Sequence, residues 1–301
     1  MSNMDDIFDS AFVGAPGDKI LLPLMGYPSE RDAIFIALVT AEYFGSDLIV
    51  LHVESKSETT ESYFDEQLSW LKERAEKMNI SVDIILAEQT FHSSLHKVIL
   101  REINKHNPNL TIMMSRRKGI FQKLRGSIAE RVARDSPTSV VIIRSPIKDW
   151  TTYGDHISPR KIIIPIGTDS PCELFATQLA IALANAGKSR DAEITLLHVL
   201  VVPETVPLDT TNDEMMKEEH KFIKQAGKFS TLLLFPMKSK VIVGRDIGRS
   251  VSHYVNKVHA DLVVMGVPYL PRKILGLYGT DTNEIFLTSK CPVVMLFRRS
   301  C

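Results

Sequence analysis

The chain has 301 residues, and its 36 basic side chains balance 36 acidic ones, giving a formal net charge of +0. This neutrality argues against an obligate nucleic-acid partner, which would need a broad basic field. No apolar run approaches the ~20 residues that cross a bilayer, and the N-terminus lacks an apolar signal core, so we expect a cytoplasmic protein without a membrane span. Three cysteines without paired or metal-binding spacing indicate unpaired thiols in a reducing compartment.

The first half alternates short apolar runs with helical patterns. After a loose, acidic leader over 1–17, strand-like runs are predicted at 20–24, 48–53, 82–87, 110–114 and 140–144. Helices are predicted over 29–44 and 61–78, and another begins at Ser127. Strands that are almost continuously apolar are typical of parallel sheets covered by helices on both faces.

The second half follows the same alternation. Ser145 to Pro159 is rich in turn residues and is predicted to connect the halves. Helices are then predicted over 170–186 and 213–229. Strand-like runs are predicted at 162–166, 194–202, 240–243, 262–266 and 293–297.

Sequence landmarks recur in the same order in the two halves, which indicates a duplication. Lys-Ile-Leu-Leu-Pro at 19–23 corresponds to Lys-Ile-Ile-Ile-Pro at 161–165, and Leu-His-Val occurs at 51–53 and 197–199. A repeat of this length is a whole domain. The prediction is two tandem Rossmann-like α/β domains, each a five-stranded parallel sheet sandwiched by helices. The expected bounds are a first domain at 18–146, a linker at 147–159 and a second domain at 160–299.

A glycine-rich connection in the second half is a candidate phosphate site, because ligands of open parallel sheets bind beyond the carboxyl ends of the strands. Its candidate residues are Met265, Gly266, Tyr269, Gly276, Gly279 and Thr280. Glycine lets backbone amides approach an anion, and a helix start adds unpaired N–H groups. Gly266, Gly279 and Thr280 would form the phosphate cradle, although strand–helix turns also use such residues for backbone reasons alone.

The corresponding connection in the first half is basic. Met114 replaces the early glycine, Arg116 begins a run of cationic residues, and Gly126-Ser127 precedes a helix. Charge-assisted contacts between Arg116 and a phosphate are one interpretation. A solvated basic edge is another, and a patch for anionic lipid or an RNA backbone is a third.

The positions of the histidines predict neither a metal site nor a catalytic role. His52 and His198 recur at equivalent positions inside apolar strands, which favours a hydrogen-bonded core role. His92 and His96 have helical spacing but lack the Glu of a zinc-binding HExxH sequence, so no metal site is predicted. Neither a nucleophile elbow nor a Walker loop occurs, so no catalytic residue is predicted either.

Several of these features together resemble one family. Ile164-Pro165 ends a strand before an alanine-rich helix, and the second strand of each half contains Leu-His-Val, preceded by Val50 in the first half and by Leu196 in the second. Ala-Asp-Leu-Val-Val-Met-Gly at 260–266 leads to Gly279-Thr280 and then to Cys-Pro-Val-Val at 291–294. In these residues the chain resembles the universal stress protein family over both halves.

The resemblance implies a tandem binding and signalling module of the stress response, with ATP or another adenine nucleotide as ligand. Mg²⁺ could accompany the nucleotide, and any ATPase activity would be slow. Val199 and Val243 would line the nucleobase side by analogy of strand position. The resemblance also implies an internal pseudo-dimer through the strands at 140–144 and 293–297, and two chains could associate further as a homodimer.

The chain departs from the family pattern at several positions. Its ATP binders carry a loop of the form Gly-x2-Gly-x9-Gly-Ser/Thr, and here Tyr269 replaces the middle glycine. They also carry an Asp after the first strand, where Met25 and Gly167 stand here. One alternative is therefore a degenerate member that binds no nucleotide and acts through protein contacts or another anionic ligand. The other, an adenylating enzyme, lacks the glycine- and serine-rich turn after the first strand that such enzymes need.

Overall fold

The computed structural model describes ten segments of the chain, and these fall into two compact units. The described residues are 18–27, 30–53, 58–89, 94–115, 127–145, 159–167, 171–186, 192–208, 213–268 and 280–298. Unit 1 holds the first five strands, and unit 2 holds the next four strands and the start of the tenth. The predicted leader and most of the predicted linker lie outside the described residues.

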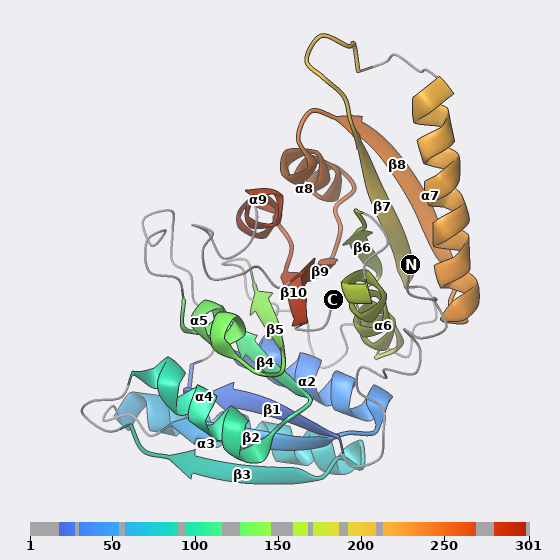
Figure 1. Ribbon diagram of the computed structural model, residues 1–301. Helices are drawn as coiled ribbons and strands as arrows, with labels where there is room; N and C mark the ends of the chain where they lie inside the picture. Colours follow the sequence, from blue (N-terminus) through green and yellow to red (C-terminus); the bar gives the residue numbers. More distant parts are fainter. Residues whose placement is uncertain are drawn as a thin grey trace. The chain divides into compact units, whose positions relative to one another are not determined.

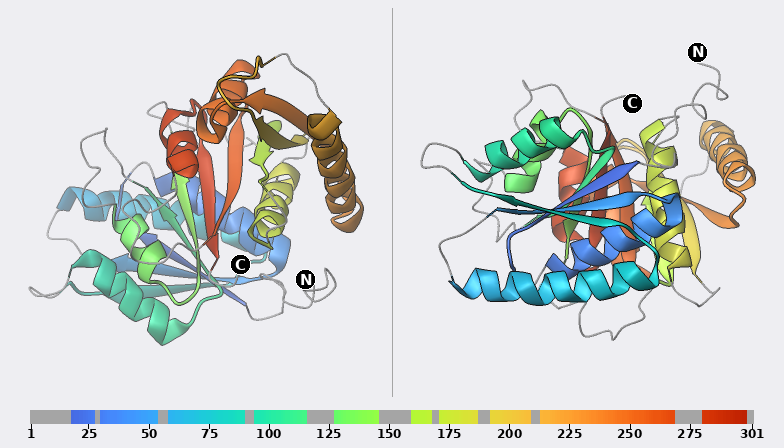
Figure 2. Two further views of the ribbon diagram at one scale, coloured as in Figure 1. Left: turned by 45° about the horizontal axis from the view of Figure 1, so that its top comes forward. Right: turned by 90° about the horizontal axis from the view of Figure 1, so that it is seen from below.

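Unit 1 is an α/β sandwich built on a parallel sheet with the strand order β3-β2-β1-β4-β5 (Figure 1). Its elements are β1 (Lys19–Leu24), α2 (Arg31–Phe44), β2 (Asp47–Val53), α3 (Glu58–Lys77), β3 (Val82–Ala87), α4 (Leu95–His106), β4 (Leu110–Met114), α5 (Ile128–Asp135) and β5 (Ser139–Arg144). Helices α2 and α3 cover one face of this sheet and α4 and α5 the other (Figure 2).

Unit 2 repeats the plan, with the strand order β10-β9-β6-β7-β8. Its elements are β6 (Lys161–Pro165), α6 (Pro171–Asn185), β7 (Glu193–Val201), α7 (Asp213–Leu232), β8 (Met237–Gly244), α8 (Ile247–Lys257), β9 (Leu262–Pro268), α9 (Thr280–Thr288) and β10 (Val293–Arg298). Helices α6 and α7 lie on one side of the sheet and α8 and α9 on the other (Figure 1).

In each unit the order of the strands reverses direction at one point. The chain moves outward from β6 to β7 and β8, then returns across β6 to β9, and unit 1 does the same around β1. Such a reversal leaves a crevice at the carboxyl ends of the two central strands, where ligands of this fold class bind. In unit 2 the reversal falls between β6 and β9.

The apolar strand runs form the cores of the two sheets. The side chains of Ile20 to Leu22 in β1 and of Ile162 and Ile164 in β6 are at most 1% exposed. The prediction of two α/β domains with helix-covered parallel sheets is therefore confirmed. In the part of the chain that the structure describes, no helix is long and apolar enough to span a bilayer.

Both repeated histidines are hydrogen-bonded to the backbone, as the sequence predicted; His52 is buried, and His198 is partly exposed. His52 Nδ1 donates to Leu24 O at 3.0 Å, and its ring stacks on Phe64 with the centroids 3.7 Å apart. His198 Nδ1 donates to Ile166 O at 2.9 Å and stacks on Phe222 at 5.0 Å. Both histidines thus tie the second strand of a unit to the end of the first strand.

The cysteines differ from the sequence-based prediction. Cys291 is a buried free thiol, but Cys172 is disulfide-bonded. The prediction of unpaired thiols is therefore wrong for Cys172. Spacing along the chain could not reveal this, because a disulfide depends on the approach of two cysteines in space.

Candidate functional site

A buried carboxylate lies at the carboxyl end of β6 in unit 2. Glu173 lies in the first turn of α6, is 7% exposed, and its Oε1 accepts a hydrogen bond from Gly167 N at 2.7 Å. Gly167 stands where the family's ATP binders carry an Asp. A carboxylate is therefore present at this turn, but it comes from the helix and holds the backbone amide.

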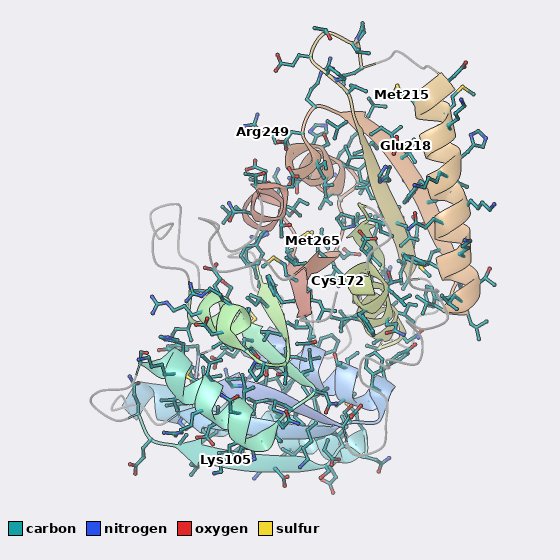
Figure 3. All side chains as sticks on the ribbon, in the orientation of Figure 1. Lys105, Cys172, Met215, Glu218, Arg249 and Met265 are labelled. Carbon is teal, nitrogen blue, oxygen red and sulfur yellow. The ribbon has the colours of Figure 1, made fainter. Side chains whose placement is uncertain are left out.

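Gly266 lies against the start of α6. A Cβ at this position would be 2.3 Å from Cys172 O and 2.9 Å from Glu173 N, which is too close for any side chain. Figure 3 labels Cys172 on α6 and Met265 on β9, the two elements that meet here. The glycine is therefore required by the packing of α6 on β9, whether or not a ligand approaches its amide.

The two valines predicted to line a nucleobase lie on opposite faces of the sheet. Val199 pairs in register with Ile242, and Val243 pairs with Leu200. Paired residues share a face and successive residues alternate, so Val199 and Val243 point in opposite directions. Val199 faces α8, since a Cβ at Gly244 would contact both its Cγ1 and Ser250 of α8. Met265 in β9 is buried at 4% exposure.

The amino ends of α8 and α9 meet beside the end of β9. Gly248 N donates to Asp281 Oδ1 at 3.3 Å, and a Cβ at Gly248 would lie 2.8 Å from Asp281 O. Asp246 caps α8 by accepting from Arg249 N at 2.8 Å. Thr280, the first residue of α9, remains exposed. The two aspartates thus accept from N–H groups of α8, whereas Thr280 is exposed.

Arg245 fixes the segment that follows β7. Its Nη1 donates to Val202 O at 3.2 Å and to Pro203 O, and its Nη2 donates to Val206 O at 2.6 Å. The guanidinium therefore shapes the rim of the site through backbone carbonyls. Sequence reasoning missed Arg245, because the carbonyls that accept its hydrogen bonds are about 40 residues away in the chain. The one available signal was its position directly after a strand, where ligands of this fold class bind.

The equivalent turn in unit 1 is also held by a buried glutamate. Glu30 is 4% exposed, and its carboxylate accepts from Met25 N at 3.0 and 2.9 Å and from Tyr27 N at 3.0 Å. Sequence reasoning looked for an Asp directly after the strand and missed Glu30 and Glu173. The available signal was an acidic residue at the start of the first helix in both halves.

Ser127 forms a capping box at the start of α5. Its Oγ accepts from Glu130 N at 3.2 Å, and its own N–H donates to Glu130 Oε2 at 2.9 Å. The hydroxyl proton of Ser127 is still able to reach an anion. Five further predicted site residues lie outside the described residues, namely Arg116, Gly126, Tyr269, Gly276 and Gly279.

The described residues contain no cluster of three or more side chains suited to a metal ion. His96 lies in the first turn of α4, and His92 is outside the described residues. Burial, together with the nearby Arg131 guanidinium, lowers the pKa of His96 below its ordinary value.

Comparison with known proteins identifies the family. The model of the universal stress protein family matches residues 17–144 and again residues 159–296. The chain belongs to the universal stress protein family. The two matches make it a tandem member, as the resemblance implied. A search of curated proteins finds no significant match.

Solved structures share the tandem fold at low sequence identity. A universal stress protein from Archaeoglobus fulgidus has a TM-score of 0.59 at 17% identity, covering 95% of this chain and 98% of that one. The cytoplasmic domain of a prokaryotic cation chloride cotransporter has a TM-score of 0.56 at 10% identity, covering 93% and 95%. A universal stress protein in complex with cAMP covers 42% of this chain and 97% of its own, at 17% identity and a TM-score of 0.36. The likenesses to the first two structures show the fold alone.

Proposed function

We propose that this tandem universal stress protein is a binding and signalling module that takes an adenine nucleotide, with ATP as the candidate, at the carboxyl end of the unit 2 sheet. The observation that carries the proposal is the coincidence of two features. The strand order reverses between β6 and β9, and the glycine-rich connection of the family's ATP binders begins at the end of β9.

The phosphates would lie at the start of α9. The first turn of a helix presents unpaired N–H groups and the positive end of the helix dipole. Thr280 is exposed there, so its hydroxyl is able to donate to a phosphate oxygen. Gly279 would contribute its backbone amide, as the family loop implies.

The nucleoside would lie beside Val199, on the face of the sheet that α8 covers. Gly244 lies on the same face, where a Cβ would overlap the Ser250 side chain of α8, so α8 packs closely against the sheet beside Val199. Val243 points to the other face. We therefore give the nucleobase contact to Val199 and limit Val243 to backbone contacts at the end of its strand.

One observation favours the alternative of a degenerate module that works through protein contacts. Asp281 follows Thr280 directly and, with Asp246, places two carboxylates near the proposed phosphates. Like charges at this distance disfavour an anion unless a cation accompanies it. In the nucleotide proposal this cation is Mg²⁺, so removing divalent cations with EDTA should weaken ATP binding.

Calorimetry of ATP binding to the full chain tests the proposal. Thr280→Val removes the hydroxyl and keeps the shape, and a charge-assisted hydrogen bond of this kind is worth about 1.5 to 3 kcal/mol, so affinity should fall by about tenfold or more. Thr288→Val is the matched control, because Thr288 is exposed at the other end of α9 and donates only to Glu284 O. A wild-type chain that gives no heat with ATP would favour the degenerate module.

The proposal includes the remaining expectations from the family. The chain would act in the cytoplasm without catalysing more than slow ATP hydrolysis, and the predicted domain bounds of 18–146 and 160–299 are kept. The last strands, β5 and β10, would pair the domains as an internal pseudo-dimer, because apolar strands at the edge of a sheet need covering. Sedimentation velocity of the full chain would show whether two such chains form a homodimer.

A further inference from the structure

The turn between α7 and β8 carries an apolar residue in the left-handed conformation, where the other described left-handed helix ends carry a polar residue or glycine. Five described helices are followed by a residue in the left-handed conformation: Gly45, Asn79, Asn107, Leu234 and His259. Leucine is strained at positive φ, whereas glycine and asparagine tolerate it. Among the described residues, Leu234 is the one large apolar side chain held in this way.

Leu234 is also the most exposed of the large apolar side chains in the described part of the chain. It is 90% exposed, and Leu232 beside it is 39% exposed. Phe235 is partly exposed and Pro236 is exposed, so a short apolar tip, which we define as residues 232–236, projects into solvent. Neither packing nor backbone preference within the chain accounts for a leucine at this position.

The equivalent turn in unit 1 is an internal comparison. Asn79 follows α3 with φ 53°, and Ile80 N donates to Ala75 O at 2.8 Å. Leu234 follows α7 with φ 50°, and Phe235 N donates to Ser230 O at 3.2 Å. The backbone of this turn therefore has the same conformation in the two units. The two units share the turn, with a polar residue in it in unit 1 and an exposed leucine in unit 2.

The surroundings of the tip are basic. The strands of unit 2 begin, and its helices end, at this end of the sheet. The exposed or partly exposed basic residues described there are Arg160, Lys161, Lys228, Lys238, Lys257 and Lys290. Two carboxylates accompany them: Glu193 pairs with Lys238 at 2.5 Å, and Asp261 accepts from the N–H groups of Arg160 and Lys161. Counted over the described residues, this end is thus cationic, and it lies opposite the proposed nucleotide site.

We propose that the tip at 232–236 binds the surface of an anionic membrane, with Leu234 inserted among the lipid headgroups and the surrounding lysines on the lipid phosphates. A bilayer accepts one projecting apolar side chain without a preformed pocket, and anionic lipids attract nearby lysines. A protein partner would need a larger complementary surface than one projecting turn provides. The contact is peripheral and reversible, because few apolar side chains are involved.

Co-sedimentation of the full chain with vesicles tests this proposal. The chain should bind vesicles of phosphatidylglycerol and phosphatidylcholine more strongly than vesicles of phosphatidylcholine alone, and added salt should weaken binding. Leu234→Asn should lower the partition coefficient about tenfold. Lys228→Gln should lower it about fivefold. Leu234→Asn suits the left-handed backbone, so it should leave the chain folded.

Leu86→Asn is the matched control, because Leu86 is a 63% exposed leucine of β3 in unit 1 and is not part of the tip. It should bind vesicles as the wild type does. The proposal is overturned if anionic vesicles are not bound, or if Leu234→Asn binds them as well as the wild type. A change in sedimentation velocity with Leu234→Asn, without a change in vesicle binding, would instead make the tip a contact between two copies and would also overturn it.

Discussion

At the scale of single residues, the most conspicuous repeated side chains serve the fold. His52 and His198 repeat because each closes the same contact in its unit, from a ring nitrogen to the carbonyl at the end of the first strand. Sequence patterns predicted this role from the apolar neighbours. The patterns did not reveal Glu30, Glu173 or Arg245, because each acts through hydrogen bonds to backbone groups, which no motif of side chains marks.

Replacing His52 tests the structural role. His52 is 3% exposed, so His52→Ala should lower the free energy of unfolding by about 3 kcal/mol, through the lost stack on Phe64 and an unpaired carbonyl at Leu24. His198→Ala should cost less, because His198 is partly exposed. Urea denaturation measures both. A His198→Ala chain of unchanged stability that no longer binds ATP would show instead that the histidine is functional.

The pair of Glu193 and Lys238 gives a pH-dependent prediction. The Lys238 ammonium, bonded to the carboxylate, holds the pKa of Glu193 below its ordinary value. Because the pKa of this carboxyl is lower in the folded chain, its ion pair stabilises the folded state at pH values above the ordinary carboxyl pKa. This contribution is lost as pH falls through the pKa of the folded state. Because the pair is solvent-exposed, we expect less than about 1 kcal/mol. NMR titration should show the pKa of Glu193 rising in Lys238→Met; an unchanged value would mean that another group sets it.

At the scale of helices and strands, continuous apolar runs were the reliable signal, and every predicted strand occurs. The strand at 240–243 is longer than predicted, since β8 spans Met237–Gly244. Lys238, Ser239 and Lys240 are exposed, which obscured the apolar pattern on which the prediction depended. The positions of Val199 and Val243 on opposite faces depend on the pairing register of β7 and β8, which no single strand sequence reveals.

Substitutions at two glycines distinguish the contribution of close packing to stability from that of helix propensity. Gly266→Ala should destabilise unit 2 by about 3 kcal/mol, because its Cβ would overlap the backbone of α6. Gly227 lies within α7 with nothing within 4 Å of its Cβ position, so Gly227→Ala should stabilise the chain by about 0.5 to 1 kcal/mol. Urea denaturation compares them. Equal stability of the two variants would contradict the close packing of α6 on β9.

At the scale of the whole molecule, duplication explains the similarity between the units. Each unit keeps the strand order, the stacked histidine and a buried glutamate after the first strand. The units differ in the connection between the fourth strand and the last helix, which is basic in one and glycine-rich in the other. The sequence could predict the duplicated fold, because hydrophobic pattern determines it, but a ligand site depends on distances that the pattern does not contain.

Hydrogen–deuterium exchange of the full chain with and without ATP tests the central claim most directly, because it reports both binding and its location. We predict that ATP and Mg²⁺ slow the exchange of amides at the end of β9 and in the first turn of α9, while α5 and the tip at 232–236 remain unchanged. Exchange that ATP leaves unaltered throughout unit 2, or protection confined to unit 1, would contradict the account.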